Sequence, residues 1–149
     1  MTVYVDTSVL LRVVTGAPGR LPSWRKITRP LSSQLILLEC ARTIDRARIR
    51  FRLDDREVLD RRLAVQEQVD AFEIVPLAAI VLDRASEPFP TAIGSLDAIH
   101  LASALLARRR YPDMILATHD DELATAAGAM GLRVIGAPPG PRGAKGPTA

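Results

Sequence analysis

Two aspartates stand at the end of short apolar runs, a position from which side chains often bind ligands. Asp6 directly follows residues 3–5, and Asp120 follows residues 114–117 after two intervening residues. Either aspartate also has a purely structural interpretation, because Asp is a favoured N-cap of a following helix. Each position alone leaves both interpretations open.

Two further acidic residues interrupt apolar stretches. Glu39 lies within residues 35–41, and Asp97 lies between Leu96 and Ala98. An ionised carboxylate among apolar side chains costs several kcal/mol unless a partner compensates its charge. The structural alternatives are a surface position for Glu39 and, for Asp97, a helix-dipole interaction of about 0.3–1 kcal/mol.

A bound divalent cation would offset the repulsion among these four carboxylates if they meet in one cleft. Unit charges about 4 Å apart repel by roughly 4 kcal/mol at an effective dielectric near 20. Residues 31–41, 93–107 and 114–126 contain no Lys or Arg that could offset this repulsion. Oxygen ligands favour Mg²⁺, with Mn²⁺ as the alternative, over zinc. Water acidified by such an ion is a nucleophile suited to phosphodiester hydrolysis.

Other residues with chemical potential have simpler structural interpretations. His100 follows Asp97 by three residues, and we favour a hydrogen-bonded structural imidazole over a catalytic one. We expect His119 to be a loop residue and Cys40 a small core residue. Ser95 is expected to cap a helix, because no base is placed to activate it as a nucleophile.

The elements that position these side chains alternate between strand and helix. Strands are predicted at residues 2–5, 31–33, 72–75, 114–117 and 132–135. Helices are predicted near residues 9–14, 33–50, 55–70, 77–87, 95–109 and 120–130. Residues 16–30 hold two glycines and three prolines and are predicted to be an irregular connection, in which Trp24 has no assigned role.

This alternation predicts an α/β fold, a three-layer α/β/α sandwich around a central, mainly parallel sheet. Right-handed crossovers place the loops that follow the strands along one edge, where ligands bind in such sheets. Asp6 and Asp120 fall on that edge. We expect residues 1–136 to form the domain and residues 137–149, rich in Pro and Gly, to be a disordered tail.

Length and composition indicate a single intracellular domain. A chain of 149 residues favours one domain, and no charge-free run exceeds ten residues, too short for a membrane span. The first residues lack a basic stretch ahead of an apolar one, so no signal peptide is expected. The single cysteine fits a reducing compartment. A cytoplasmic location without membrane contact follows as the expectation.

Several motifs occur in the order seen in the PIN-domain family. They are Val3-Tyr4-Val5-Asp6-Thr7-Ser8-Val9-Leu10, the Glu39 segment after Ser32-Ser33, Leu96-Asp97-Ala98-Ile99-His100-Leu101-Ala102, and Leu116-Ala117-Thr118-His119-Asp120-Asp121-Glu122-Leu123. The chain resembles this family over about residues 3–136, and it is most similar to the VapC-type toxin ribonucleases of toxin–antitoxin pairs.

This resemblance implies a PIN-like fold and a metal-dependent endoribonuclease, the toxin of such a pair. The acidic positions that hold Mg²⁺ or Mn²⁺ match Asp6, Glu39, Asp97 and Asp120, and the polar positions around them match Thr7, Ser8 and Thr118. Asp121 remains an alternative to Asp120 as the fourth acid. The resemblance also implies a homodimer and a small VapB-like antitoxin that inserts a segment near the acidic cleft.

The arginines add a hypothesis about the partners. The net charge is +3 and 18 of the 20 basic residues are Arg, eight of them within residues 42–62. A solvated helix surface explains such a run. An acidic centre repels phosphate, however, so an RNA enzyme needs a basic rim. We therefore hypothesise that Arg46, Arg48, Arg50 and Arg52 contact the RNA or the antitoxin.

Two other functions compete with the nuclease. A catalytically idle binding module of the same fold would keep the shape without the chemistry. A receiver-like signalling domain would also place acids at strand ends, but it needs a Lys near the end of the sheet. The two lysines, Lys26 and Lys145, do not follow predicted strands, which argues against that alternative.

Overall fold

The structure, a computed structural model, describes residues 1–137, and five short strands form its central sheet. They are β1 (Thr2–Val5), β2 (Arg29–Ser33), β3 (Glu73–Val75), β4 (Ile115–Ala117) and β5 (Arg133–Ile135). The order across the sheet is β3-β2-β1-β4-β5, and all four pairings are parallel. The predicted tail lies outside the described residues from residue 138 onward.

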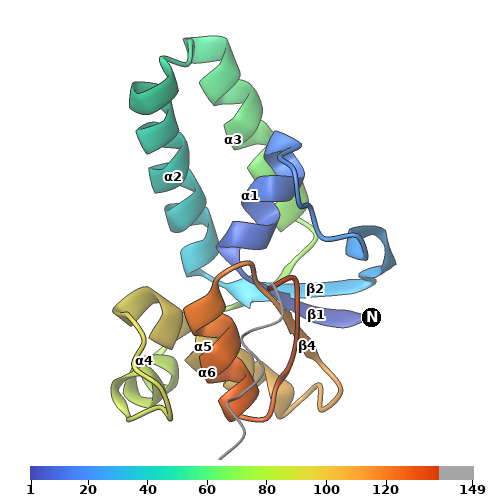
Figure 1. Ribbon diagram of the computed structural model, residues 1–149, viewed down its shortest axis with the longest axis vertical. Coiled ribbons are helices and arrows are strands. Elements are labelled where there is room, and N and C mark those ends of the chain that lie inside the picture. Colours follow the sequence, from blue (N-terminus) through green and yellow to red (C-terminus); the bar gives the residue numbers. More distant parts are fainter. Residues whose placement is uncertain (138–149) are drawn as a thin grey trace, which may run out of the picture.

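Helices cover both faces of the sheet, which confirms the predicted three-layer fold (Figure 1). They are α1 (Thr7–Thr15), α2 (Leu35–Phe51), α3 (Asp55–Val69), α4 (Ala79–Ser86), α5 (Ser95–Arg108) and α6 (Asp121–Ala129). On β1, Val3 and Val5 pack with α1, α2 and α3, whereas Tyr4 packs in a second core with α5 and α6. Because successive side chains of a strand point to opposite faces of the sheet, β1 contributes to a separate core on each face.

Two helices, α2 and α3, form a long hairpin that extends beyond the sheet (Figure 1). Asp45 on α2 forms ion pairs with Arg42 and with Arg62 on α3. Asp54 begins α3 with a reciprocal pair of hydrogen bonds to Glu57, a capping box. The base of α2, which carries Glu39, lies next to the sheet, and its tip lies far from it.

Two local predictions need correction, and the structure places Trp24, for which no role was assigned. β2 begins at Arg29 and includes Pro30, which was predicted to lie in an irregular connection. β3 pairs only with residues 31–33 of β2, so Pro30 lies where the strand has one neighbour, and a missing N–H is tolerated there. Ser95 is the first residue of α5 and not its cap, since Gly94 holds the cap position. Trp24 lies in a short 3₁₀ helix and packs against Phe72.

No helix within residues 1–137 is long and apolar enough to cross a lipid bilayer.

Candidate active site

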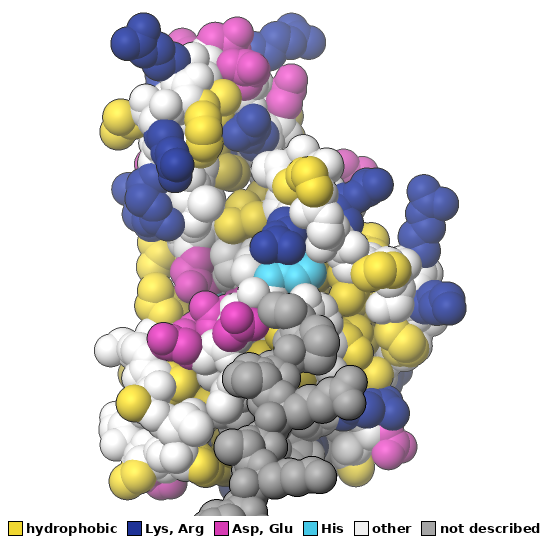
Figure 2. All heavy atoms as spheres, in the orientation of Figure 1, with side chains coloured by type: hydrophobic (Ala, Val, Ile, Leu, Met, Phe, Trp, Pro, Cys, Tyr) yellow, Lys and Arg dark blue, Asp and Glu magenta, His cyan; other side chains and the backbone are white. Residues whose placement is uncertain are grey.

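The carboxyl ends of β1 and β4 lie side by side, because these strands pair in parallel with Val5 opposite Ala117. Asp6 follows β1 and caps α1, and Asp120 caps α6 just beyond β4. Both aspartates therefore have the capping role and also lie at the predicted edge. Figure 2 shows acidic side chains gathered where the α2–α3 hairpin meets the rest of the molecule.

Asp6 is held by short hydroxyl side chains. It is 6% exposed, and its Oδ2 accepts hydrogen bonds from Ser8 Oγ at 2.5 Å and from Thr118 Oγ1 at 2.9 Å. Thr118 follows β4, so this contact joins the ends of two neighbouring strands. Ser8 Oγ also accepts a hydrogen bond from the His119 backbone at 3.0 Å. The polar positions predicted around the acids are therefore in contact with one of them.

Glu39 points from α2 towards the same edge. Its Oε2 accepts hydrogen bonds from Thr7 Oγ1 at 2.8 Å and from His100 Nε2 at 2.5 Å. Partial burial favours a higher pKa for Glu39, but the hydrogen bond and charge of His100 and the hydroxyl of Thr7 outweigh it and lower the pKa. Glu39 is thus neither a free surface residue nor a core residue.

Asp97, in the first turn of α5, has a pKa that depends on its acidic neighbours. Its pKa is raised to about 6, first by partial burial and then by the negative charges of Asp120, Asp6 and Glu39. The nearby His100 opposes this effect. Four carboxylates separated by long stretches of sequence therefore share one electrostatic environment.

The structure distinguishes Asp120 from its neighbour Asp121. Asp120 Oδ1 accepts a hydrogen bond from the Leu123 backbone at 2.8 Å, and its own N–H donates to Thr118 Oγ1 at 3.0 Å. Asp120 also acts on the pKa of Asp97, whereas Asp121 is exposed at the start of α6. The position of Asp120 at the acidic edge favours Asp120 over Asp121 as the fourth acid.

The donor chemistry of these residues fits a hard divalent ion. Within residues 1–137, each carboxylate keeps an oxygen without a hydrogen bond, namely Asp6 Oδ1, Glu39 Oε1, Asp120 Oδ2 and both oxygens of Asp97. The ion pairs found there for Asp6 and Glu39 involve only His100. No three His, Cys, Asp or Glu residues in the described part already converge on one point. The set matches Mg²⁺ in ligand type, and side-chain rotation is needed to close it around an ion.

The sequence did not indicate one residue of this region, Tyr4. His100 and Tyr4 are both 0% exposed, and Tyr4 Oη lies 2.9 Å from His100 Nδ1. Burial, first of all, raises the pKa of the Tyr4 phenol far above its usual value. The strand pattern gave no signal for this contact, because a tyrosine in a strand is usually a core residue. His100 is a buried, hydrogen-bonded imidazole, as the structural interpretation expects.

The second histidine has a separate contact. His119 Nδ1 donates a hydrogen bond to the Gly136 carbonyl at 2.8 Å. Gly136 has φ 93°, and a Cβ there would lie 2.8 Å from the Thr118 carbonyl oxygen. Only glycine fits this close approach. It brings the end of β5 against the loop that carries Asp120.

The four arginines of the partner hypothesis lie on the outer half of α2 and at its end. Arg48 pairs with Asp55, Arg46 donates to Thr43 Oγ1 at 3.0 Å, and Arg50 stacks on Phe51. At about 1.5 Å of rise per helical residue, Arg46 lies roughly 10 Å along α2 from Glu39. Figure 2 shows Lys and Arg side chains interspersed with acidic ones at the outer end of the hairpin, and acidic side chains at its base.

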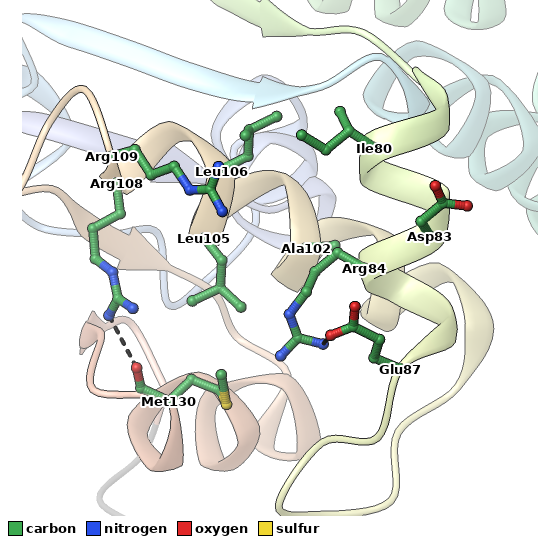
Figure 3. A pocket seen from close by; sticks show the side chains of 10 residues that line it. All are labelled: Ile80, Asp83, Arg84, Glu87, Ala102, Leu105, Leu106, Arg108, Arg109 and Met130. Atoms are coloured by element: carbon green, nitrogen blue, oxygen red, sulfur yellow. Dashed lines mark hydrogen bonds and ion pairs between the residues drawn. The ribbon is translucent and has the colours of Figure 1, made fainter.

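A cavity of about 440 Å³ lies away from this edge, among α4, α5 and α6 (Figure 3). Two of the three guanidinium groups that line it have partners: Arg84 pairs with Glu87 at 3.5 Å and stacks on Phe89, and Arg108 donates to the Met130 carbonyl at 2.9 Å. The acidic edge, and not this cavity, therefore carries the chemistry predicted from the sequence.

Comparisons with known proteins agree with the fold described above. The model of one family, the PIN domain, matches residues 3–129. Ribonuclease VapC35 of Mycobacterium tuberculosis, in strains CDC 1551 / Oshkosh and ATCC 25618 / H37Rv, is 34% identical over 138 residues, covering 89% of this chain and 95% of the relative.

Two solved structures share the fold. VapBC2 from Rickettsia felis, bound to a DNA fragment from its promoter, has a TM-score of 0.61 at 13% identity and covers 91% of this chain and 98% of that one. PAE2754 from Pyrobaculum aerophilum has a TM-score of 0.61 at 15% identity, covering 90% of this chain and 83% of that one.

Proposed function

This chain belongs to the PIN-domain family, and we propose that it is a metal-dependent endoribonuclease, the toxin of a toxin–antitoxin pair acting in the cytoplasm. One observation carries the proposal: Asp6 and Asp120 follow the paired strands β1 and β4 at the same edge of the sheet, close enough to Asp97 that, after burial, the carboxylates of Asp120, Asp6 and Glu39 raise its pKa. The similarity to ribonuclease VapC35 supports RNA as the substrate. Membership of the PIN family leaves no support for the receiver-like alternative.

We assign the metal to Asp6, Glu39, Asp97 and Asp120, with Mg²⁺ as the expected ion and Mn²⁺ as its substitute. When bound, the ion supplies Lewis acidity for hydrolysis of a phosphodiester bond. The hydroxyl groups of Thr7, Ser8 and Thr118 hold one oxygen of Glu39 and one of Asp6. That restraint leaves the second oxygen of each available as a ligand.

The basic rim gives the substrate a second set of contacts. Arg46, Arg48, Arg50 and Arg52 along the hairpin would neutralise phosphates of a strand whose centre lies at the acidic edge. Replacing all four by Gln should flatten the salt dependence of RNA binding, by about 0.7 in logarithmic slope for each phosphate that is no longer neutralised. Binding is measured in the Asp97→Asn background, so that the RNA stays intact. An Arg133→Gln control on β5 should keep the slope; an unchanged slope in the fourfold variant would discard the rim.

A small antitoxin and a second copy of the chain are the proposed protein partners. The α2–α3 hairpin exposes six large apolar side chains, which are Leu37, Leu38, Ile49, Phe51, Leu59 and Leu63. Exposed apolar patches of this kind mark protein contact surfaces. Co-expression with the neighbouring small reading frame tests the antitoxin, and size-exclusion chromatography with light scattering tests the dimer.

The nuclease activity is tested with purified protein and RNA, with Mg²⁺, with Mn²⁺ and with EDTA. We expect cleavage with either ion, none with EDTA, and none by Asp97→Asn with its fold intact. The matched control is Asp83→Asn, an exposed aspartate of α4, which should cleave normally. Full cleavage by Asp97→Asn would refute the site assignment. A metal-loaded protein that cleaves no RNA would instead support the catalytically idle binding module.

A further inference from the structure

Three polar groups form a chain from the centre of the protein to the acidic edge. Tyr4 Oη on β1 lies 2.9 Å from His100 Nδ1 on α5, and His100 Nε2 lies 2.5 Å from Glu39 Oε2 on α2. Tyr4 and His100 are completely buried, whereas the Glu39 side chain is 18% exposed. This series of hydrogen-bonded groups therefore joins three separate elements and ends on a single carboxylate oxygen.

The chemistry of Glu39 fixes the direction of one hydrogen bond. An ionised carboxylate only accepts, so His100 Nε2 carries a hydrogen and donates it to Glu39. Tyr4 Oη contacts Nδ1 on the opposite side of the ring. The imidazole is therefore held between two contacts, in the orientation that points its Nε2–H at Glu39.

Packing alone does not explain this chain. Tyr4 lies in an apolar core with Leu31, Leu101 and Leu116, where a phenyl ring would pack without needing a partner for a hydroxyl. A buried polar group is costly unless it is hydrogen-bonded. The contacts of Tyr4 Oη with His100 Nδ1 and of His100 Nε2 with Glu39 Oε2 connect both buried groups to the carboxylate.

We propose that Tyr4 and His100 are positioning residues, which hold Glu39 Oε2 so that Oε1 is presented to a divalent ion. This inference rests on the proposed function. Thr7 Oγ1 donates to the same Oε2 at 2.8 Å. Both hydrogen bonds therefore hold one oxygen of the carboxylate and leave the other without a partner among residues 1–137. Hydrogen-bond partners that orient metal ligands typically change metal affinity by about 10–100-fold when they are removed.

The Tyr4→Phe variant isolates the effect, because Tyr4 touches neither Glu39 nor the ion site and the ring is kept. Without the phenol, the His100 ring loses the contact at Nδ1 that orients it, and its hydrogen bond to Glu39 is weakened. We expect the Kd for Mn²⁺, measured by calorimetric titration of the metal-free protein, to rise roughly 10-fold or more. Tyr111→Phe is the matched control, since its hydroxyl donates to Glu73 at 2.7 Å on the exposed surface. It should leave the Kd unchanged.

Variants of His100 and Glu39 complete the test. His100→Leu should weaken Mn²⁺ binding, and His100→Gln, whose amide N–H reaches towards the position of Nε2, should restore part of it. In a Glu39→Ala background, Tyr4→Phe should have no further effect, because the carboxylate it positions is gone. If Tyr4 had a purely structural role, Tyr4→Phe would lower thermal stability equally with and without Glu39. Its effect on Mn²⁺ binding would then not depend on Glu39.

The outcomes separate the two proposals. If the parent protein binds Mn²⁺ and folded Tyr4→Phe binds it within twofold as well, the positioning role is overturned and the nuclease proposal stands. If the parent protein binds no Mn²⁺ or Mg²⁺, both are overturned. Long-range ¹H–¹⁵N spectra of the metal-free parent protein provide a readout independent of metal. They should show His100 protonated on Nε2, and an Nε2 without a hydrogen would contradict the proposal.

Discussion

At the scale of single residues, short hydroxyl side chains determine where the carboxylates lie. Thr118 is completely buried, and its one oxygen both donates to Asp6 and accepts from the Asp120 backbone. A single threonine thus holds together two acids that are 114 positions apart in sequence. Its contribution should be measurable in both stability and metal binding.

Replacing Thr118 by Val keeps the shape and removes both hydrogen bonds. Because one partner is charged, we expect the free energy of unfolding to fall by about 1.5–3 kcal/mol. The affinity for Mn²⁺ should fall as well, since Asp6 loses a restraint. Urea unfolding and metal titration measure the two effects. Thr125→Val, which removes an exposed hydroxyl bonded only within its helix, should change neither.

The carboxylate of Asp97 is predicted to destabilise the metal-free protein. Its folded pKa of about 6 lies above its unfolded value, so folding disfavours the charged form and stability declines as the pH rises from about 4 through 6. In EDTA at pH 8, Asp97→Asn should therefore be more stable than the parent by about 1 kcal/mol, a value reduced for solvent screening at this half-buried site.

The same comparison at pH 5 provides the check on this prediction. Most Asp97 side chains are protonated there, so the advantage of Asn should shrink. Urea unfolding curves at the two pH values give the difference. A variant less stable than the parent at pH 8 would contradict the electrostatic account of the site.

The sequence indicated the acids and, through the family resemblance, Thr7, Ser8 and Thr118 around them. Asp6 and Asp120 were detectable from their positions after predicted strands, and Glu39 and Asp97 because charge in an apolar context is costly and needs an explanation. Tyr4 was not, since a tyrosine in a strand has an ordinary role in the core. Its hydroxyl gains significance only from His100, which lies 96 positions away, and a single sequence does not encode that proximity locally.

At the scale of elements, the α2–α3 hairpin turns at a residue in an unfavourable backbone conformation. Arg52 ends α2 with φ 51° and ψ 46°, and it is the one non-glycine residue of the described chain with positive φ. Glycine is the residue that usually occupies such a helix end. The conformation of Arg52 at this turn therefore lowers the free energy of unfolding.

Arg52→Gly should raise the free energy of unfolding by about 0.5–1 kcal/mol, because the left-handed conformation carries no steric penalty for glycine. Arg50→Gly, inside the last turn of α2, should lower it by about 1 kcal/mol. Thermal unfolding distinguishes the two directions. Equal destabilisation by both changes would mean that the Arg52 side chain makes a contact worth more than the strain.

The elements themselves could be predicted because their periodicity is strong. Every predicted strand and helix is present, and α2 and α3 end within two residues of the prediction. The errors lie where tertiary contacts outweigh local preference: Pro30 is drawn into β2 by pairing with Val3, and Trp24 is placed by packing against Phe72. Neither contact can be read from neighbouring residues.

At the scale of the whole molecule, an ion at the acidic edge would bridge β1, α2, α5 and the start of α6. Since an ion that binds only the folded state stabilises it, Mn²⁺ at about 100 times its Kd should add about 2.7 kcal/mol. For a chain of this size the midpoint of thermal unfolding should rise by roughly 5–10 °C. Differential scanning fluorimetry with Mn²⁺ and with EDTA measures it. Asp97→Asn should show almost no rise, and a rise equal to that of the parent would place the ion elsewhere.

The parallel sheet has a practical consequence for handling the protein. All five strands run in one direction, so Met1, whose amino group bonds to Thr28 at 2.9 Å, lies at the edge opposite the acids. The main chain leaves β5 at Gly136, directly against His119. An affinity tag fused ahead of Met1 therefore starts at the edge opposite the acids, whereas a chain cut after residue 137 would carry a fused tag next to the acidic edge.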